Sequence, residues 1–190
     1  MEIPEPGAWF SNMTMNALDR LRLTPRGHGA LLTTTSWAAA VFTVVLPYLI
    51  VGVSRYSLFT VIEPAPLARV AVIGLIGWGI VAVSVHLASG ILGADASWSV
   101  SALVTAQAHL PLGAAAIAIF GLSFALQAFT VSRVAAIVGV TIWFPGALVA
   151  ATAYAAATEW QRAVLPGLAV ATVWGLTTGL PVLRLIGHLL

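Results

Sequence analysis

The chain has 190 residues, of which 60% are hydrophobic and only 7% are charged, and its mean hydropathy is +1.01. About a quarter of the residues of a soluble domain are charged, so this composition excludes an ordinary soluble protein and predicts an integral membrane protein. A net charge of +2 predicts no nucleic-acid partner, and the lack of cysteine excludes disulfides, thiolate metal ligands and a cysteine nucleophile.

Residues 1–31 form a polar segment that precedes the first long apolar stretch. Apolar side chains recur in this segment at three- and four-residue spacing, which predicts an amphipathic helix lying in the membrane interface. Trp9, Phe10 and Met13 are its candidate partner-binding residues, and the alternative is a helix that only rests on the lipid headgroups. The recurring apolar positions are Trp9, Phe10, Met13, Ala17 and Leu21.

Residues 32–190 contain five stretches with almost no charge, each long enough for a helix that crosses a bilayer, which needs about 20 residues. Backbone amides in hydrocarbon must find partners within their own segment, so we expect helices rather than strands. The predicted fold class is therefore all-α: a polytopic membrane protein whose single transmembrane domain follows the interfacial segment. The expected spans are residues 32–53, 67–92, 101–127, 131–156 and 163–187.

The boundary between the third and fourth spans consists of four polar residues between positions 127 and 133. One broken helix with a re-entrant piece is therefore an alternative to two separate spans.

The orientation follows from the distribution of arginine. Arg20, Arg22 and Arg26 cluster just before the first span, and short basic segments next to a span stay in the cytoplasm. We therefore expect a multi-pass protein of the cell membrane with a cytoplasmic N-terminus.

Proline interrupts the predicted helices. Pro47, Pro111 and Pro145 each lie inside a span, and two further prolines, Pro166 and Pro181, bracket the fifth. Proline has no N–H to donate and clashes with the preceding turn, so we expect kinked helices that pack together.

Glycines form two flat faces on which helices can approach each other closely. Gly74 and Gly77, with Gly79, lie along the second span, and Gly175 and Gly179 make a Gly-x-x-x-Gly pair in the fifth. We expect these glycines to be helix-packing residues. Packing within the chain is the simpler interpretation, and an interface with another subunit is the alternative.

Histidine supplies the main chemical potential inside the predicted spans. His86 lies about two turns before the end of the second span and His109 about two turns into the third, so an antiparallel hairpin brings them to similar depth. With Gln107 they form a candidate site for haem b, a proton relay or a metal. The nearest carboxylate, Asp95, is in the turn, so we predict no metal site, and no cofactor unless the histidines bind haem b. The plainer interpretation is that each histidine hydrogen-bonds a carbonyl or an amide.

Enzyme motifs are missing from the sequence. It has no G-x-S-x-G elbow, Walker loop or H-E-x-x-H, so we predict no catalytic residue. Glu159 and Arg162 lie beside Trp160 in the loop after the fourth span, an arrangement typical of a surface ion pair with an aromatic anchor at the headgroups. A path for solutes would need more polar groups than the spans offer. The candidates for it are Thr105, Gln107, Ser123, Gln127 and Thr141.

The segment around the turn between the second and third spans reads VHLASGILGADASWSVSALVTAQAHLPLG, and the loop before the last span reads YAAATEWQRAVLPGLAV. These stretches resemble the Yip (Ypt-interacting protein) domain family, particularly its prokaryotic members, with Pro111 at the family's proline. The resemblance runs from about Leu21 to the end of the chain and implies a non-enzymatic membrane organiser or adaptor. The acidic Leu-Tyr-Gly-Pro type motif of the eukaryotic trafficking members is absent, so no Rab-type GTPase partner is expected.

The sequence therefore predicts a non-enzymatic membrane protein that acts as a scaffold, adaptor or accessory subunit of a membrane complex. Its expected partners are the lipid bilayer and either other membrane subunits or further copies of itself. A redox or proton-handling subunit that uses His86 and His109 is the alternative, and a small-solute channel or transporter is a weaker one.

Overall fold

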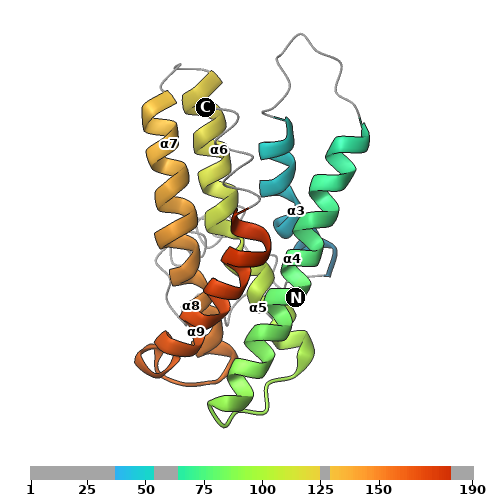
Figure 1. The fold of residues 1–190 in the computed structure, drawn as a ribbon. Coiled ribbons are helices and arrows are strands. Elements are labelled where there is room, and N and C mark those ends of the chain that lie inside the picture. Colours follow the sequence, from blue (N-terminus) through green and yellow to red (C-terminus); the bar gives the residue numbers. More distant parts are fainter. Residues whose placement is uncertain (1–36, 54–63, 125–128, 181–190) are drawn as a thin grey trace, which may run out of the picture.

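The structure is a computed structural model that describes residues 37–53, 64–124 and 129–180. Every element in these ranges is helical, and joining consecutive elements gives five rods (Figure 1). The prediction of an all-α protein with five helices is confirmed. The elements are α3 (Trp37–Val53), α4 (Pro64–Ile91), α5 (Trp98–Ala108), α6 (Leu110–Phe124), α7 (Phe129–Val138), the π-helix η1 (Gly139–Trp143), α8 (Phe144–Ala155), α9 (Trp160–Trp174) and the π-helix η2 (Gly175–Gly179).

Two of these rods are long and apolar enough to cross a membrane, over Leu67–Ile91 and Trp98–Ala118. Shorter apolar helices occupy Trp37–Val53 and Gly139–Ala155. α6 and α7 pack against each other along their length (Figure 1), so the third and fourth rods are separate helices and not one broken helix.

Several predicted features fall outside the described residues, among them Gln127 and Pro181. The interfacial helix with Trp9, Phe10 and Met13 belongs to the N-terminal 36 residues, and so does the arginine cluster from which the orientation was argued.

The turns after α4 and after α8 lie at the same end of the bundle (Figure 1) and close their helices in the same way. The turn after α4 has Gly93 at φ +82°, and the turn after α8 has Ala157 at φ +47°. Around Ala157, the N–H of Thr158 donates to the Ala153 carbonyl at 3.0 Å, which completes a Schellman-type cap. This left-handed conformation suits glycine, and it costs an L-residue such as Ala157 roughly 1 kcal/mol.

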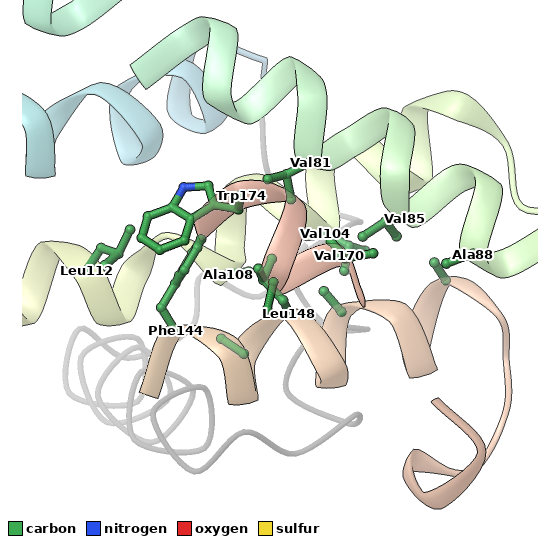
Figure 2. Packing of buried hydrophobic residues seen from close by; sticks show 14 of the residues in the cluster. Val81, Val85, Ala88, Val104, Ala108, Leu112, Phe144, Leu148, Val170 and Trp174 are labelled. Atoms are coloured by element: carbon green, nitrogen blue, oxygen red, sulfur yellow. The ribbon is translucent and has the colours of Figure 1, made fainter. Parts of the chain in front are cut away.

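The largest cluster of buried apolar side chains involves α4, α5, α8 and α9 and extends to α6 and η1 (Figure 2). Trp174, Phe144 and Leu148 are its largest members, and alanines and valines fill the remaining space. Small residues let the backbones approach: a Cβ on Gly167 of α9 would lie only 2.6 Å from the Cα of Val149 in α8. Close contact at small residues is typical of helices that pack in a membrane.

Candidate functional site

Three of the five rods contain an irregular segment, two of them in mid-length and the last at the end of its described part. α5 and α6 are separated at His109, because Pro111 has no N–H to donate to the preceding turn and the His109 N–H makes a tighter, three-residue bond at 3.1 Å. η1 ends directly before Phe144, and η2 begins directly after Trp174. Because π-helical turns occur frequently at functional sites, the side chains next to these irregularities are the first candidates for a site.

Those side chains meet in the middle of the bundle. We call Tyr48, His109, Phe144 and Trp174 the aromatic cluster. The His109 and Phe144 rings meet edge to face with centroids 5.1 Å apart, and the Phe144 and Trp174 centroids are 4.4 Å apart; Figure 2 shows these last two side by side. Tyr48, which follows Pro47 in α3, has its ring centroid 6.4 Å from that of His109. All four side chains are buried, and none is more than 3% exposed.

His109 has one ring nitrogen satisfied and one without a partner. Its Nδ1 lies 2.8 Å from the Thr105 carbonyl, and because a carbonyl only accepts, Nδ1 carries the proton. Nε2 is then the acceptor, and no hydrogen-bond partner reaches it among the described residues. The Thr105 hydroxyl is held in turn, since it donates to the Ser101 carbonyl at 2.8 Å and lies 3.1 Å from the Trp78 indole nitrogen. The imidazole is therefore fixed in one tautomer, with Nε2 directed into the protein interior.

His86 has separate surroundings. Its ring meets that of Trp98, the first residue of α5, edge to face at 6.2 Å. His109 comes eleven residues after Trp98 in the same rod, which is about 16 Å along the axis at 1.5 Å per residue. In the described part of the chain, the aromatic rings that contact His86 and those that contact His109 are different residues, so these contacts do not bring the two histidines together. A shared cofactor stays a prediction.

The four predicted packing glycines differ in what surrounds them. A Cβ on Gly74 would lie 2.6 Å from an aromatic ring of α3, and one on Gly77 would lie 2.6 Å from a threonine hydroxyl of η2. A Cβ on Gly179 would lie 2.7 Å from the indole of α9, whereas one on Gly175 would meet nothing within 4 Å. Three of the four thus lie against other side chains of the described chain, and Gly175 and Gly179 both line an open groove of about 250 Å³ along α9 and η2.

Two of the polar residues suggested for a solute path, Thr105 and Thr141, have different surroundings. Thr105 is buried, whereas Thr141 is exposed and donates to the Ile137 carbonyl at 2.6 Å. Glu159 and Arg162 are both exposed, and the N–H of Arg162 donates to the Glu159 carbonyl at 3.1 Å. In the part of the chain that the structure describes, no group of three or more His, Asp or Glu residues is placed to hold a metal ion.

His109 was identified from the sequence, whereas the three aromatic residues of the cluster were not. A local signal existed for two of them, because Tyr48 directly follows Pro47 and Phe144 directly precedes Pro145. An aromatic residue next to an intrahelical proline lies where the helix departs from regular geometry. Trp174 has no such neighbour, and only the tertiary structure brings it to the cluster.

No protein-family model, curated protein or solved structure matches the chain.

Proposed function

We propose that the chain is an integral membrane protein that crosses the bilayer five times and acts, without catalysis, as a scaffold or accessory subunit of a membrane complex. The observation that carries this proposal is the distribution of apolar and polar side chains between the outside and the inside of the bundle.

The outside of the bundle is apolar over most of its length. Leu165 is 79% exposed, Leu176 67% and Ile142 66%, and every described rod contributes further large apolar side chains of this kind. Soluble monomers rarely expose contiguous apolar patches above a few hundred Å². A lipid environment removes the cost of this surface, because the acyl chains are as apolar as the side chains that face them.

Charged and aromatic residues lie where a bilayer places them. Between Arg69 and Asp95 the chain has no acidic residue, lysine or arginine. The helical part of this stretch, residues 70–91, is about 33 Å long at 1.5 Å per residue, enough to cross a hydrocarbon core of about 30 Å. Trp98 and Trp160 begin α5 and α9 at one end of the bundle and are each about half exposed. Tryptophan at such positions anchors helices at the headgroup level.

The buried hydroxyl groups support a structural role rather than conduction. Thr152 donates to the Leu148 carbonyl of its own helix at 2.8 Å, and Thr105 makes the same kind of bond within α5. These hydroxyls satisfy the backbone of the turn before them, so they do not form a continuous polar path through the bundle. The Yip resemblance belongs to the same proposal, with an organiser or adaptor as its implied role.

A redox or proton-handling subunit is the second candidate. It is favoured by one observation, the buried Nε2 of His109 that has no partner among the described residues. Ionisable residues inside a membrane commonly mark proton or redox pathways.

The two candidates give different results when the tagged protein is purified from its native membrane in mild detergent. The scaffold proposal predicts that the same proteins co-purify in fixed ratio, that they are absent from an unrelated multi-pass bait, and that replacing Trp9, Phe10 and Met13 by Ala releases them. The redox form of the second candidate, with haem bound at His109, predicts a visible absorption band that is lost in His109→Ala. A colourless protein that purifies alone would contradict the scaffold proposal and this haem-binding form.

A further inference from the structure

We propose that the aromatic cluster is a binding site for a single hydroxyl group, which donates a hydrogen bond to His109 Nε2 and accepts one from Tyr48 Oη. The inference does not depend on the proposed scaffold role, because the cluster has the same geometry whatever the protein assembles with.

Hydrogen-bond donors and acceptors in the aromatic cluster are not all paired with each other. His109 contributes one acceptor, Nε2, that has no partner in the described part of the chain. Tyr48 Oη accepts from the Trp174 indole nitrogen at 3.5 Å, and its own O–H proton has no acceptor among the described residues. One acceptor and one donor, on rings with centroids 6.4 Å apart, are therefore left to bind the same group. Buried polar groups are nearly always hydrogen-bonded in folded proteins.

A group that binds both His109 Nε2 and Tyr48 Oη must donate one hydrogen bond and accept another. A carbonyl accepts from Tyr48 but has nothing to donate to Nε2, and an ammonium donates to Nε2 but has no lone pair for the tyrosine proton. A hydroxyl does both. The group is also small, because all four cluster side chains are almost fully buried and the Phe144 and Trp174 rings stand against each other. Water and the hydroxyl of a short alcohol meet these requirements.

The fold holds the His109 and Tyr48 rings, and with them Nε2 and Oη, in fixed positions. The bond from Nδ1 to the Thr105 carbonyl fixes the tautomer that leaves Nε2 as an acceptor. Gly74 leaves room for the Tyr48 ring, since a Cβ there would lie 2.6 Å from the ring carbon Cδ2. The site is therefore preorganised from both sides, by α5 through Thr105 and by α4 through Gly74.

The test is nuclear magnetic resonance of the full chain, labelled with ¹⁵N-histidine and dissolved in detergent micelles. His109→Gln identifies the His109 signals by their loss. The proposal predicts a protonated Nδ1, an unprotonated and hydrogen-bonded Nε2, and a cross-peak between the His109 ring protons and a hydroxyl. Exchange with bulk solvent in the absence of neighbouring C–H cross-peaks identifies water, and cross-peaks to the adjoining C–H protons identify an alcohol.

Two variants separate the site from general packing. Tyr48→Phe removes the donor, so the cross-peak is lost and the Nε2 resonance shifts, whereas Tyr154→Phe makes the same chemical change outside the aromatic cluster and leaves both signals unchanged. If Tyr48→Phe does not fold, the parent spectrum alone decides. A parent protein with no hydroxyl cross-peak, or with the proton on Nε2 instead of Nδ1, would overturn the proposal, and so would a Tyr48→Phe spectrum identical to that of the parent.

Discussion

Gly167→Ala tests the packing of α9 on α8. The new Cβ would lie 2.6 Å from the Cα of Val149 and 2.8 Å from its Cγ2, and because the nearest atom is backbone, a rotamer change cannot relieve the contact. Overpacking typically costs about 1–3 kcal/mol, and the helix preference of Ala over Gly returns roughly 1 kcal/mol. We expect a net loss of about 1 kcal/mol, which corresponds to a melting temperature lower by roughly 2–4 °C for a chain of this size.

The assay is thermal unfolding of the purified protein in detergent micelles, followed by the helical circular-dichroism signal. Gly79→Ala is the matched control, because a Cβ at Gly79 meets nothing within 4 Å, and we expect it to melt at the parent temperature or slightly above. If Gly167→Ala melts together with Gly79→Ala, the close contact between α8 and α9 is not a feature of the folded protein and the packing argument fails.

Three further substitutions have defined outcomes in the same assay. Phe144→Ala should destabilise by about 3 kcal/mol, since it removes a fully buried ring from the aromatic cluster; an unchanged melting temperature would show that the cluster is not tightly packed. Ala157→Gly should stabilise by about 1 kcal/mol, because glycine holds φ +47° without strain, and a loss of stability would refute the left-handed cap. Ser97→Ala should cost about 0.5–1 kcal/mol by removing the side-chain oxygen that caps the Val100 N–H at the start of α5; no loss would mean that water replaces the cap.

Helix positions were predictable because each rod is an uninterrupted apolar stretch with polar or charged residues at its ends. The second span was expected over 67–92, and α4 runs from Pro64 to Ile91. The fourth was expected over 131–156, and its rod runs from Phe129 to Ala155. Length and composition determine such helices without reference to their neighbours.

The π-helices η1 and η2 were not predictable in the same way. An extra residue in a helical turn rotates every later side chain around the helix axis. The stability of such a π-helical turn therefore depends on what those side chains contact. Gly175 and Gly179 both line one groove, but a Cβ on Gly179 would meet the Trp174 indole, whereas one on Gly175 would meet nothing within 4 Å. Sequence periodicity alone assumes a constant helix and therefore does not predict where such a turn occurs.

The candidate site was predictable only in part. The position of His109 inside an apolar span marked it from sequence, but its pairing with His86 rested on counting residues through a turn whose geometry the sequence does not determine. The structure surrounds His109 instead with Tyr48 and Phe144, from rods that are distant in sequence.

Sided cysteine labelling tests the central proposal, five crossings of a membrane, most directly. The chain has no cysteine, so Ser57→Cys, Ser97→Cys and Thr158→Cys each give one reporter, and the unsubstituted protein is the blank. In intact cells, an impermeant maleimide should label position 57 alone, and positions 97 and 158 should react only after permeabilisation. Labelling of position 57 on the same side as position 97, or recovery of the protein in the soluble fraction, would contradict the account.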